Sequence, residues 1–307
     1  MILALSGGTG GAKLLDGLAQ VAGQSELAAA INTGDDADVW GLRVCPDLDI
    51  CTYTLAGVVA ERGWGYAGDT FRCLEGMATY GREAWFGLGD RDLATHLYRT
   101  LRLAEGAPLS LITRELGERM GVQARLMPMC DEEVATRITT PGGVRSFQEY
   151  LVRDGAAEPI ERIELVGIER ARPAPGLLEA IAAAERIVIC PSSPVVSIGT
   201  ILAVPGVRPA LAARRERTVA VSPIVGRRPV EGPADRFLAG AGYPECSAAQ
   251  MARIYADVAA TFVLDHRDAE EVAEVERAGL RPVLLDALMP DRAARARLAA
   301  ESLEALA

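Results

Sequence analysis

The sequence predicts an α/β protein with a Rossmann-like, mostly parallel sheet flanked by helices and a mostly helical insertion that caps the carboxyl edge of the sheet. Short apolar runs, typical of buried parallel strands, alternate with amphipathic stretches at helical spacing. The first apolar run leads into a glycine-rich turn and then into a helix-like stretch, which is the order of a strand–turn–helix unit. No tandem repeat or linker separates two self-contained halves.

The expected elements run through the whole chain. We expect buried strands at residues 2–5, 27–32, 126–130, 187–190, 218–221, 261–264 and 282–285. We expect helices at 14–21, from 46, at about 69–80, through 97–103, at 177–184, from 235, and near 269–278 and 291–305. Residues 134–140 and 144–152 alternate like an antiparallel pair around the turn at 141–143. Residues 1–307 should form one domain, with the helical cap at about 46–121 and a small antiparallel β segment at about 134–170.

Composition limits the class of partner. The formal net charge of −10, from 32 Lys+Arg against 42 Asp+Glu, disfavours binding to nucleic acid. The chain has no apolar run long enough to span a membrane, and its start resembles a strand rather than a signal peptide, so we expect a cytoplasmic protein. The cysteines show no CxxC spacing and no histidine partners, which favours reduced thiols over a zinc site. They are Cys45, Cys51, Cys73, Cys130, Cys190 and Cys246.

The turn after the first strand reads SGGTGGAK from Ser6 to Lys13. Glycines without Cβ atoms let a ligand approach the backbone, and the N-terminus of the following helix attracts an anion, so a phosphate or diphosphate is the expected guest. Lys13 is the only lysine in the chain, which suggests that a compact ammonium group is required there. The alternative is a turn that needs glycine only for packing. Neither the P-loop nor the dinucleotide pattern fits completely, because Leu14 follows the lysine and Lys13 stands where a third glycine belongs.

Aspartates follow the second predicted strand and return a few residues later. Asp35, Asp36 and Asp38 lie in the loop at 33–41, and Asp47 and Asp49 follow Pro46 at a helix start. In a parallel sheet these loops lie at the carboxyl edge beside the glycine turn, where carboxylates and substrate phosphates could hold Mg²⁺. Two structural alternatives stay open: an acidic surface turn, and carboxylates that only complement the helix dipole.

Two further groups are candidates for binding. The turn at 191–200 places Ser192, Ser193 and Ser197 after another buried strand, which repeats the arrangement of the glycine turn. Aromatic residues between glycines, such as Trp85, could bound a flat ligand, or they could fill a helical core. His96 follows on a helix with apolar neighbours, where a hydrogen-bonded core histidine is more common than a base.

Together these blocks resemble the 2-phospho-L-lactate transferase (CofD) family of deazaflavin coenzyme biosynthesis. The resemblance runs nearly end to end. It rests on SGGTGGAK from Ser6, NTGDDADVWGL from Asn32, CPDLDICTYTLAG from Cys45, GWG at Gly63, WFGLGDRDLATH from Trp85, MPMCDEEVATRI from Met127, PSSPVVSIG from Pro191, VSPIVG from Val221 and EGPAD from Glu231. Each block is weak alone, and all nine in order are specific.

The resemblance implies a Rossmann-like core, Mg²⁺ as the metal and a homodimer. It also implies that a phospholactyl-type group, derived from 2-phospholactate or phosphoenolpyruvate, passes from a guanosine-diphosphate-activated donor to the ribityl hydroxyl of the deazaflavin Fo, with release of GMP. The product is the core of coenzyme F-420. The sequence leaves open which three-carbon acid the donor carries.

On that resemblance we hypothesise a role for each group. The donor's nucleotide and diphosphate would contact Gly7, Gly8, Thr9, Gly10, Gly11, Lys13, Ser192, Ser193 and Ser197. Asp36 and Asp49, with Asp35 second, would hold the metal, while Asp47 or a neighbouring carboxylate would orient or deprotonate the acceptor hydroxyl. The catalytic set is therefore Asp36, Asp47 and Asp49. Trp85, Asp90 and Asp92 would enclose the deazaflavin, and Asp36→Asn is expected to abolish turnover.

Two other functions compete with this hypothesis. A non-catalytic nucleotide-sugar-binding regulator of the gluconeogenesis-factor type shares the core, but it should lack the PDLD and LGDRDLATH blocks that this chain carries. A nicotinamide-dependent oxidoreductase needs an acidic residue at the end of the second strand, where this chain has Asn32. We therefore expect a transferase.

Overall fold

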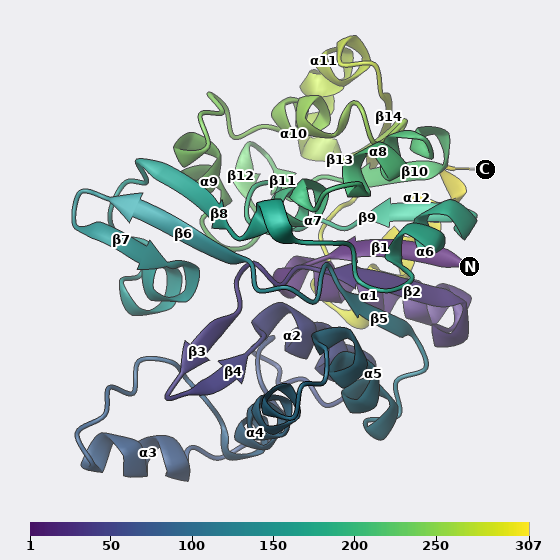
Figure 1. Cartoon of the computed structure of the whole chain (residues 1–307). Helices are drawn as coiled ribbons and strands as arrows, with labels where there is room; N and C mark the ends of the chain where they lie inside the picture. The colour runs from purple at the N-terminus through teal and green to yellow at the C-terminus, as the bar shows by residue number, and fades with distance from the viewer. Residues whose placement is uncertain (307) are drawn as a thin grey trace.

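In the computed structural model, which describes residues 1–306, seven parallel strands form one sheet between two layers of helices (Figure 1). The strand order is β14-β13-β10-β9-β1-β2-β5. The strands are β1 (Ile2–Ser6), β2 (Leu27–Ile31), β5 (Arg125–Pro128), β9 (Arg186–Ile189), β10 (Thr218–Val221), β13 (Thr261–Asp265) and β14 (Arg281–Leu285). The predicted α/β Rossmann-like fold class is confirmed.

The strand order reverses between β1 and β9. From β1 the chain moves outward through β2 to β5, then returns to the other side of β1 and continues through β9, β10, β13 and β14. Such a reversal opens a crevice at the carboxyl ends of the two central strands, where ligands of doubly wound sheets bind. The loops after β1 and β9 are the predicted glycine and serine turns.

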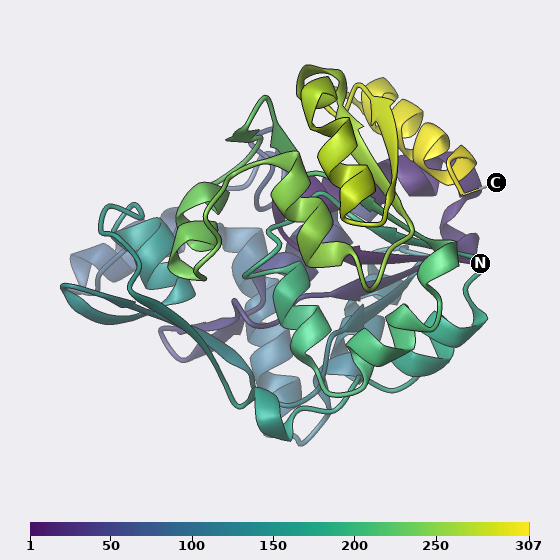
Figure 2. The ribbon, with the colours of Figure 1, turned by 90° about the horizontal axis from the view of Figure 1, so that it is seen from above.

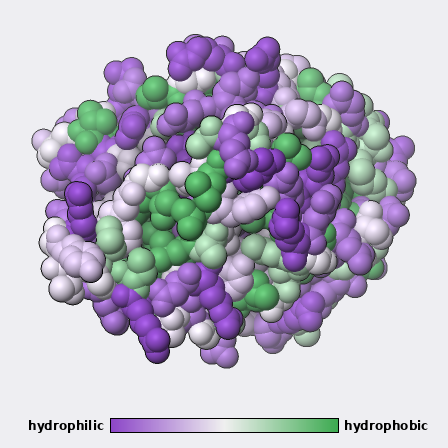
Figure 3. Space-filling view, turned by 60° about the horizontal axis from the view of Figure 1, so that its bottom comes forward, coloured by the Kyte–Doolittle hydropathy of each residue, from purple (hydrophilic) through white to green (hydrophobic). Residues whose placement is uncertain are grey.

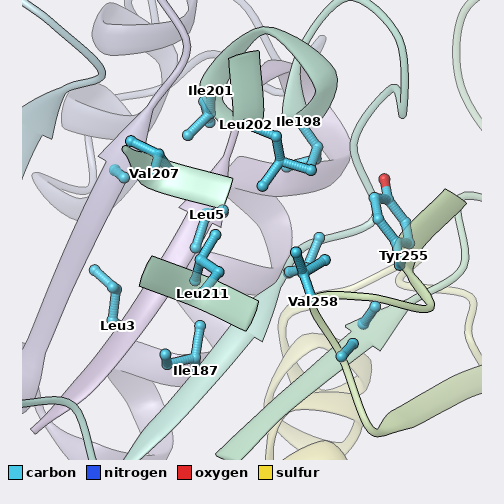
Figure 4. Close-up of a cluster of buried hydrophobic side chains, with 14 of the residues drawn as sticks. Leu3, Leu5, Ile187, Ile198, Ile201, Leu202, Val207, Leu211, Tyr255 and Val258 are labelled. Atoms are coloured by element: carbon cyan, nitrogen blue, oxygen red, sulfur yellow. The ribbon is translucent and has the colours of Figure 1, made fainter. Parts of the chain in front are cut away.

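Both faces of the sheet are buried, because alternate residues of β1 enter different cores. Leu3 and Leu5 share a core with α6 (Leu177–Ala183), α7 (Ile198–Ala203), α8 (Val207–Ala212), α10 (Ala248–Tyr255) and α11 (Val272–Arg277). Figure 4 shows side chains of α7, α8 and α10 in this core. Ile2 and Ala4 pack with α1 (Gly8–Ala22), α2 (Pro46–Leu55), α5 (Leu109–Arg119) and α12 (Arg292–Glu304). Figure 2 shows the sheet between these layers.

The segment between β2 and β5 is mostly helical. After the hairpin of β3 (Ala37–Val39) and β4 (Leu42–Val44) it contains α2, α3 (Arg72–Thr79), α4 (Asp90–Ala104) and α5. These elements lie below the sheet and beyond its carboxyl edge in Figure 1. The first strand and the turn of this hairpin lie in the stretch at 33–41 where the sequence predicts only a polar loop. Its two-residue turn places Trp40 at φ 53° and Gly41 at φ 81°, the left-handed pair that a tight hairpin requires.

A second, antiparallel sheet of order β7-β6-β8 extends from the same edge. Its strands are β6 (Ala135–Thr140), β7 (Gly143–Ser146) and β8 (Arg162–Val166). The expected strand at 144–152 is too long, because a π-helical turn, Glu149–Arg153, replaces its second half. Ser146 and Glu149 explain the change: the Glu149 carboxylate accepts from the Ser146 N–H at 2.8 Å, and the Ser146 hydroxyl accepts from the Glu149 N–H at 3.3 Å. This reciprocal pair starts a helical turn.

The remaining elements complete the carboxyl edge. The short hairpin of β11 (Ile224–Val225) and β12 (Arg228–Pro229) follows β10 and leads into α9 (Ala234–Gly240). The 3-10 segments are Gln24–Glu26, Ile168–Arg170, Arg215–Arg217 and His266–Glu271. Among residues 1–306, no helix combines the length and apolar character that crossing a bilayer requires. Hydrophobic side chains gather near the centre of one face, with hydrophilic ones around them (Figure 3).

Candidate active site

A cavity of about 740 Å³ lies at the carboxyl edge of the sheet, where the strand order reverses. Loops after β1, β2, β9, β10 and β14 contribute to its lining, together with helices α2 and α4 of the insertion. The predicted residues that line it are Gly7, Gly8, Thr9, Gly10, Lys13, Asp35, Asp47, Asp49, Asp92, Ser192, Ser193 and Ser197. The volume is of the size that small-molecule sites have in proteins.

The glycine turn needs glycine for two different reasons. A Cβ atom at Gly7 would lie 2.6 Å from the Asp47 carboxylate and 2.8 Å from the Ser197 Cβ, and one at Gly10 would lie 2.5 Å from the Pro191 carbonyl oxygen. Gly8 instead has φ +64°, with nothing within 4 Å of an added Cβ. Close packing therefore accounts for Gly7 and Gly10, while Gly8 supplies the backbone conformation that starts α1.

The serine turn after β9 supports the glycine turn directly. The Ser192 hydroxyl accepts a hydrogen bond from the Gly7 N–H at 3.2 Å, and a Cβ at Gly11 would meet the same hydroxyl at 2.5 Å. The Ser193 hydroxyl accepts from the Val196 N–H at 3.3 Å. The two turns thus form one structural unit across the reversal point, with the N-terminus of α1 at the cavity wall.

Two buried carboxylates beside this unit share a single amide. Asn32 donates from Nδ2 to Asp35 at 3.0 Å and to Asp47 at 2.9 Å, and Asp47 also accepts from the Gly8 N–H at 2.8 Å. Burial raises the pKa of Asp47 to about 6. Burial, followed by the nearby charge of Asp47, raises the pKa of Asp35 well above its usual value. The pair is therefore short of positive charge.

Asp49 is in the opposite situation. Both nitrogens at the end of the Arg99 guanidinium donate to its carboxylate, and Arg99 Nη1 also donates to the Arg43 carbonyl at 3.2 Å. His96 lies next to this ion pair, with Nδ1 3.6 Å from Asp49 and Nε2 3.3 Å from Asp92. The Tyr53 hydroxyl donates to Asp92 at 2.7 Å. The side chains form a buried network in the cavity wall.

Asp36 lies outside the main cavity, although it follows Asp35 directly. It lines a separate cavity of about 360 Å³ with Thr33, Arg43 and Asp131 among its neighbours. The Cys45 thiol donates to its Oδ2 at 2.9 Å, while Oδ1 has no hydrogen-bond partner among residues 1–306. Burial raises the pKa of Asp36 to about 7. A turn closed by the Asp36 N–H on the Thr33 carbonyl directs Asp36 into this cavity, while Asp35 and Asp49 line the main one. A single ion held by Asp35, Asp36 and Asp49 does not fit this geometry.

The three residues expected around the deazaflavin also separate. Asp92 lines the cavity, whereas among the described residues Trp85 and Asp90 lie outside its lining. Trp85 packs edge-on against Phe86 and under the Arg153 guanidinium. Asp90 accepts from the N–H groups of Arg72 and Cys73 at the start of α3. This contact fixes the start of α3 at Arg72 rather than near residue 69.

Sequence reasoning missed several residues that build the site. In the sequence, Asn32 indicates only that the acidic residue of a dinucleotide site is absent. An amide at the carboxyl end of a strand can, however, join two loops, as Asn32 does here. Arg99 follows His96 by three and Asp92 by seven positions, which places all three on one face of α4. An apolar wall of Phe86, Phe147, Leu151, Phe237 and Met289 comes from distant segments, so no local pattern could reveal it.

The residues present fit a divalent ion that is bound together with a phosphate-bearing substrate. Among residues 1–306, no three His, Cys, Asp or Glu side chains converge closely enough to hold a metal by themselves. Mg²⁺ often takes only one or two carboxylates and completes its shell with substrate phosphates and water. Asp35 and Asp47 supply such a pair beside the helix N-terminus that would receive the phosphates.

The comparisons with known proteins agree with the geometry. A family model described as 2-phospho-L-lactate transferase CofD matches residues 2–303. A relative from Streptomyces griseus named phosphoenolpyruvate transferase is 47% identical over 310 residues, covering 99% of this chain and 97% of the relative. A relative of the same name from Thermobifida fusca is 46% identical and covers 88% of each chain.

A solved structure supports the fold alone. The crystal structure of a UPF0052 family protein from Bacillus halodurans matches with a TM-score of 0.65 at 15% identity, covering 98% of both chains. Because the identity is low, this likeness extends to the arrangement of the strands and helices and not to the chemistry.

Proposed function

The chain belongs to the 2-phospho-L-lactate transferase CofD family and is a transferase, and on that premise we propose that it moves a phosphoenolpyruvate-type group from a guanosine-diphosphate-activated donor to the ribityl hydroxyl of the deazaflavin Fo. The names of the relatives favour phosphoenolpyruvate over phospholactate as the three-carbon acid. In the step, the hydroxyl oxygen forms a bond to the donor's terminal phosphorus, and the bond from that phosphorus to GMP breaks. The hydroxyl proton passes to solvent, and GMP leaves with the electron pair of the broken P–O bond.

The observation that carries the proposal is the pairing of two features across one cavity. The N-terminus of α1, Gly8 and Lys13 can neutralise a diphosphate. The Asp35–Asp47 pair adjoins the same turn, because Asp47 accepts a hydrogen bond from the Gly8 N–H. Phosphoryl transfer depends mainly on positioning and charge neutralisation, which this arrangement can supply. The serines of the β9 turn would contact the nucleotide.

Asp35 and Asp47 are the residues we assign to Mg²⁺, in place of Asp36 and Asp49. When bound, the ion would neutralise charge on the phosphate oxygens during transfer. Asn32 keeps the two carboxylates together, and Asp47, which faces the glycine turn, would orient the acceptor hydroxyl. The Asp49 carboxylate is paired with the Arg99 guanidinium, so Asp49 would form part of the cavity wall instead of binding the ion.

The acceptor would lie against the apolar wall. Phe147 and Phe237 stack with ring centroids 5.5 Å apart, and Phe86 and Leu151 line the same cavity. A flat deazaflavin ring gains from burial against such side chains. Asp92 would face the polar ribityl chain, while Trp85 and Asp90 would act only by holding the surrounding segments.

The test is a defined reaction followed by mass spectrometry. Purified protein is given Fo, MgCl₂ and guanosine-diphosphate-activated phosphoenolpyruvate or phospholactate in separate reactions. The proposal expects a dehydro adduct of Fo and an equal amount of GMP from the phosphoenolpyruvate donor, and no adduct when EDTA replaces MgCl₂. Formation of GMP without an Fo adduct would contradict the proposed acceptor. A uridine-diphosphate-activated donor serves as the matched control.

The resemblance also leads us to propose a homodimer located in the cytoplasm. Light scattering coupled to size-exclusion chromatography would give a mass of twice the 32.5 kDa chain for the dimer, and a single-chain mass would contradict it.

A further inference from the structure

The only lysine of the chain is paired with a carboxylate from the opposite wall of the cavity. Lys13 on α1 forms an ion pair with Glu231, which belongs to the segment between β12 and α9. Both residues line the cavity, and their side chains are 29% and 30% exposed. The cation that we assign to the diphosphate therefore already has an anionic partner within the protein.

The segment that carries Glu231 is firmly held at its base. Asp268 accepts hydrogen bonds from the N–H groups of Gly226 and Arg227 at 3.0 and 3.2 Å, and Arg227 pairs with Glu271 at 2.7 Å. These contacts fix the β11–β12 hairpin to the end of β13. The hairpin therefore gives residues 230–233 a fixed starting point.

Beyond the hairpin, residues 230–233 cross the cavity wall toward α1. Val230 donates to the Pro223 carbonyl at 3.1 Å, and Glu231 then reaches Lys13. Gly232 follows at φ +61° with open space around an added Cβ, so the backbone can turn there at little steric cost. We call residues 230–233 the strap.

A diphosphate and Glu231 compete for the same ammonium group. The diphosphate carries more negative charge than one carboxylate and also gains the N–H groups of the helix start. Once it binds Lys13, Glu231 loses its partner and faces a like charge, so the carboxylate is repelled from the site. The exchange favours movement of the strap away from α1.

Resting on the proposed function, we propose that Glu231 is an internal counter-anion for Lys13, that the donor's diphosphate displaces it, and that this exchange opens the strap over the cavity. When transfer leaves only GMP, with one phosphate, Glu231 regains Lys13 more easily. The ion pair thus sets the affinity for diphosphate and promotes release of the product.

Binding of inorganic pyrophosphate and of GDP, each with MgCl₂, tests the proposal by titration calorimetry. Glu231→Gln keeps the size of the side chain but removes its charge, so both probes should bind about three- to tenfold more tightly than to the unchanged protein. Glu216→Gln is the matched control, because Glu216 is 82% exposed and pairs with Arg215 outside the cavity. This control should leave both affinities unchanged.

A second pair of variants isolates the Lys13–Glu231 contact. If Glu231 acts through Lys13, then Lys13→Met and the double variant Lys13→Met, Glu231→Gln should bind pyrophosphate with affinities within about twofold of each other. A gain from Glu231→Gln of the same size in both backgrounds would show a general charge effect and overturn the proposal. Weaker pyrophosphate binding by Glu231→Gln would overturn it as well.

The result separates this inference from the proposed function. If Glu231→Gln binds pyrophosphate more tightly but no Fo adduct forms, the counter-anion inference stands and the proposed reaction fails. If transfer to Fo occurs and Glu231→Gln binds pyrophosphate no more tightly than the unchanged protein, the reaction stands and the inference fails.

Discussion

Two groups of carboxylates line the same cavity, and they differ in what neutralises them. Asp49 pairs with Arg99, and Asp92 accepts a hydrogen bond from the Tyr53 hydroxyl, with His96 between them. Groups of the protein itself therefore stabilise these two carboxylates. Asp35 and Asp47 have one shared amide, one backbone N–H and one threonine hydroxyl between them, and no cation at hydrogen-bond distance among residues 1–306. Buried charges require compensation. The first group is therefore suited to hold the cap against the sheet, and the second to receive an ion with the substrate.

The largest effect should come from removing a charge in the uncompensated pair. Asp47→Asn keeps an acceptor for the Gly8 N–H, so the fold should persist, while turnover should fall at least about a thousandfold because the metal site is lost. Steady-state rates and the melting temperature measure both. Asp38→Asn, on an exposed side chain of β3 outside the main cavity, is the control and should retain activity. Activity of Asp47→Asn near that of the control would contradict the assignment.

Substitutions in the network of Asp49 and Arg99 should lower the stability of the fold and not only the reaction rate. Arg99→Met leaves Asp49 buried without its partner and should lower the free energy of unfolding by about 3 to 5 kcal/mol. Urea denaturation measures this loss. Arg102→Met, on the same helix, removes an arginine whose side chain is 27% exposed against 2% for Arg99, and it should lower this free energy by less. The double variant Asp49→Asn, Arg99→Met should recover part of the loss, and failure to do so would show that packing of Arg99, not charge, is responsible.

A third prediction concerns Asp36, in the neighbouring cavity. The pKa of Asp36 in the folded protein is about 7, above the ordinary 3.8, so the folded state binds this proton more tightly than the unfolded state does. The contribution of Asp36 to the free energy of unfolding therefore falls as the pH rises from about 4 to about 7. Asp36→Asn should therefore gain stability relative to the unchanged protein over that range, reaching about 4 kcal/mol near pH 7. Denaturation at several pH values measures the difference.

The same variant tests the placement of Asp36 outside the active cavity. From the structure, Asp36→Asn should retain metal-dependent turnover within about threefold of the unchanged enzyme at neutral pH, the range expected for a substitution that touches neither the metal nor the substrate. The sequence alone leads to the opposite expectation, loss of turnover. A thousandfold loss in a stable Asp36→Asn protein would return Asp36 to the metal site.

The smallest effect should separate a closely packed glycine of the turn from a helical glycine in open space. Gly7→Ala introduces a Cβ close to Asp47 and Ser197 and should cost about 1 to 2 kcal/mol of unfolding free energy, with a loss of activity because Asp47 must shift. Gly76→Ala, in α3 with nothing within 4 Å, should be neutral or slightly stabilising. Thermal unfolding compares them, and equal effects would argue against close packing at the turn.

The sequence predicted the sheet well because its signals are local. The apolar runs of β1, β2 and β9 and the glycine and serine turns each specify their own conformation, and the parallel sheet then brings the turns together. The strand expected at 144–152 failed because the Ser146–Glu149 contact, a short-range polar signal, overrode the alternation.

The candidate site was predictable only to the level of loops. Sequence placed Asp35, Asp36, Asp47 and Asp49 near one edge, but it could not tell which face of the chain each would take. That choice depends on Arg99, Asn32 and Cys45, each of which donates hydrogen bonds to particular carboxylates. These donors are brought to the carboxylates by the fold. Side-chain pairing of this kind is a property of the assembled fold.

The most direct test of the account is a crystal structure of the protein with GDP and Mn²⁺, in which anomalous scattering locates the ion. We predict that the diphosphate lies at the N-terminus of α1 within reach of Lys13, and that Asp35 and Asp47 bind the ion. An ion held by Asp36 or Asp49, or a nucleotide bound away from the glycine turn, would contradict the account.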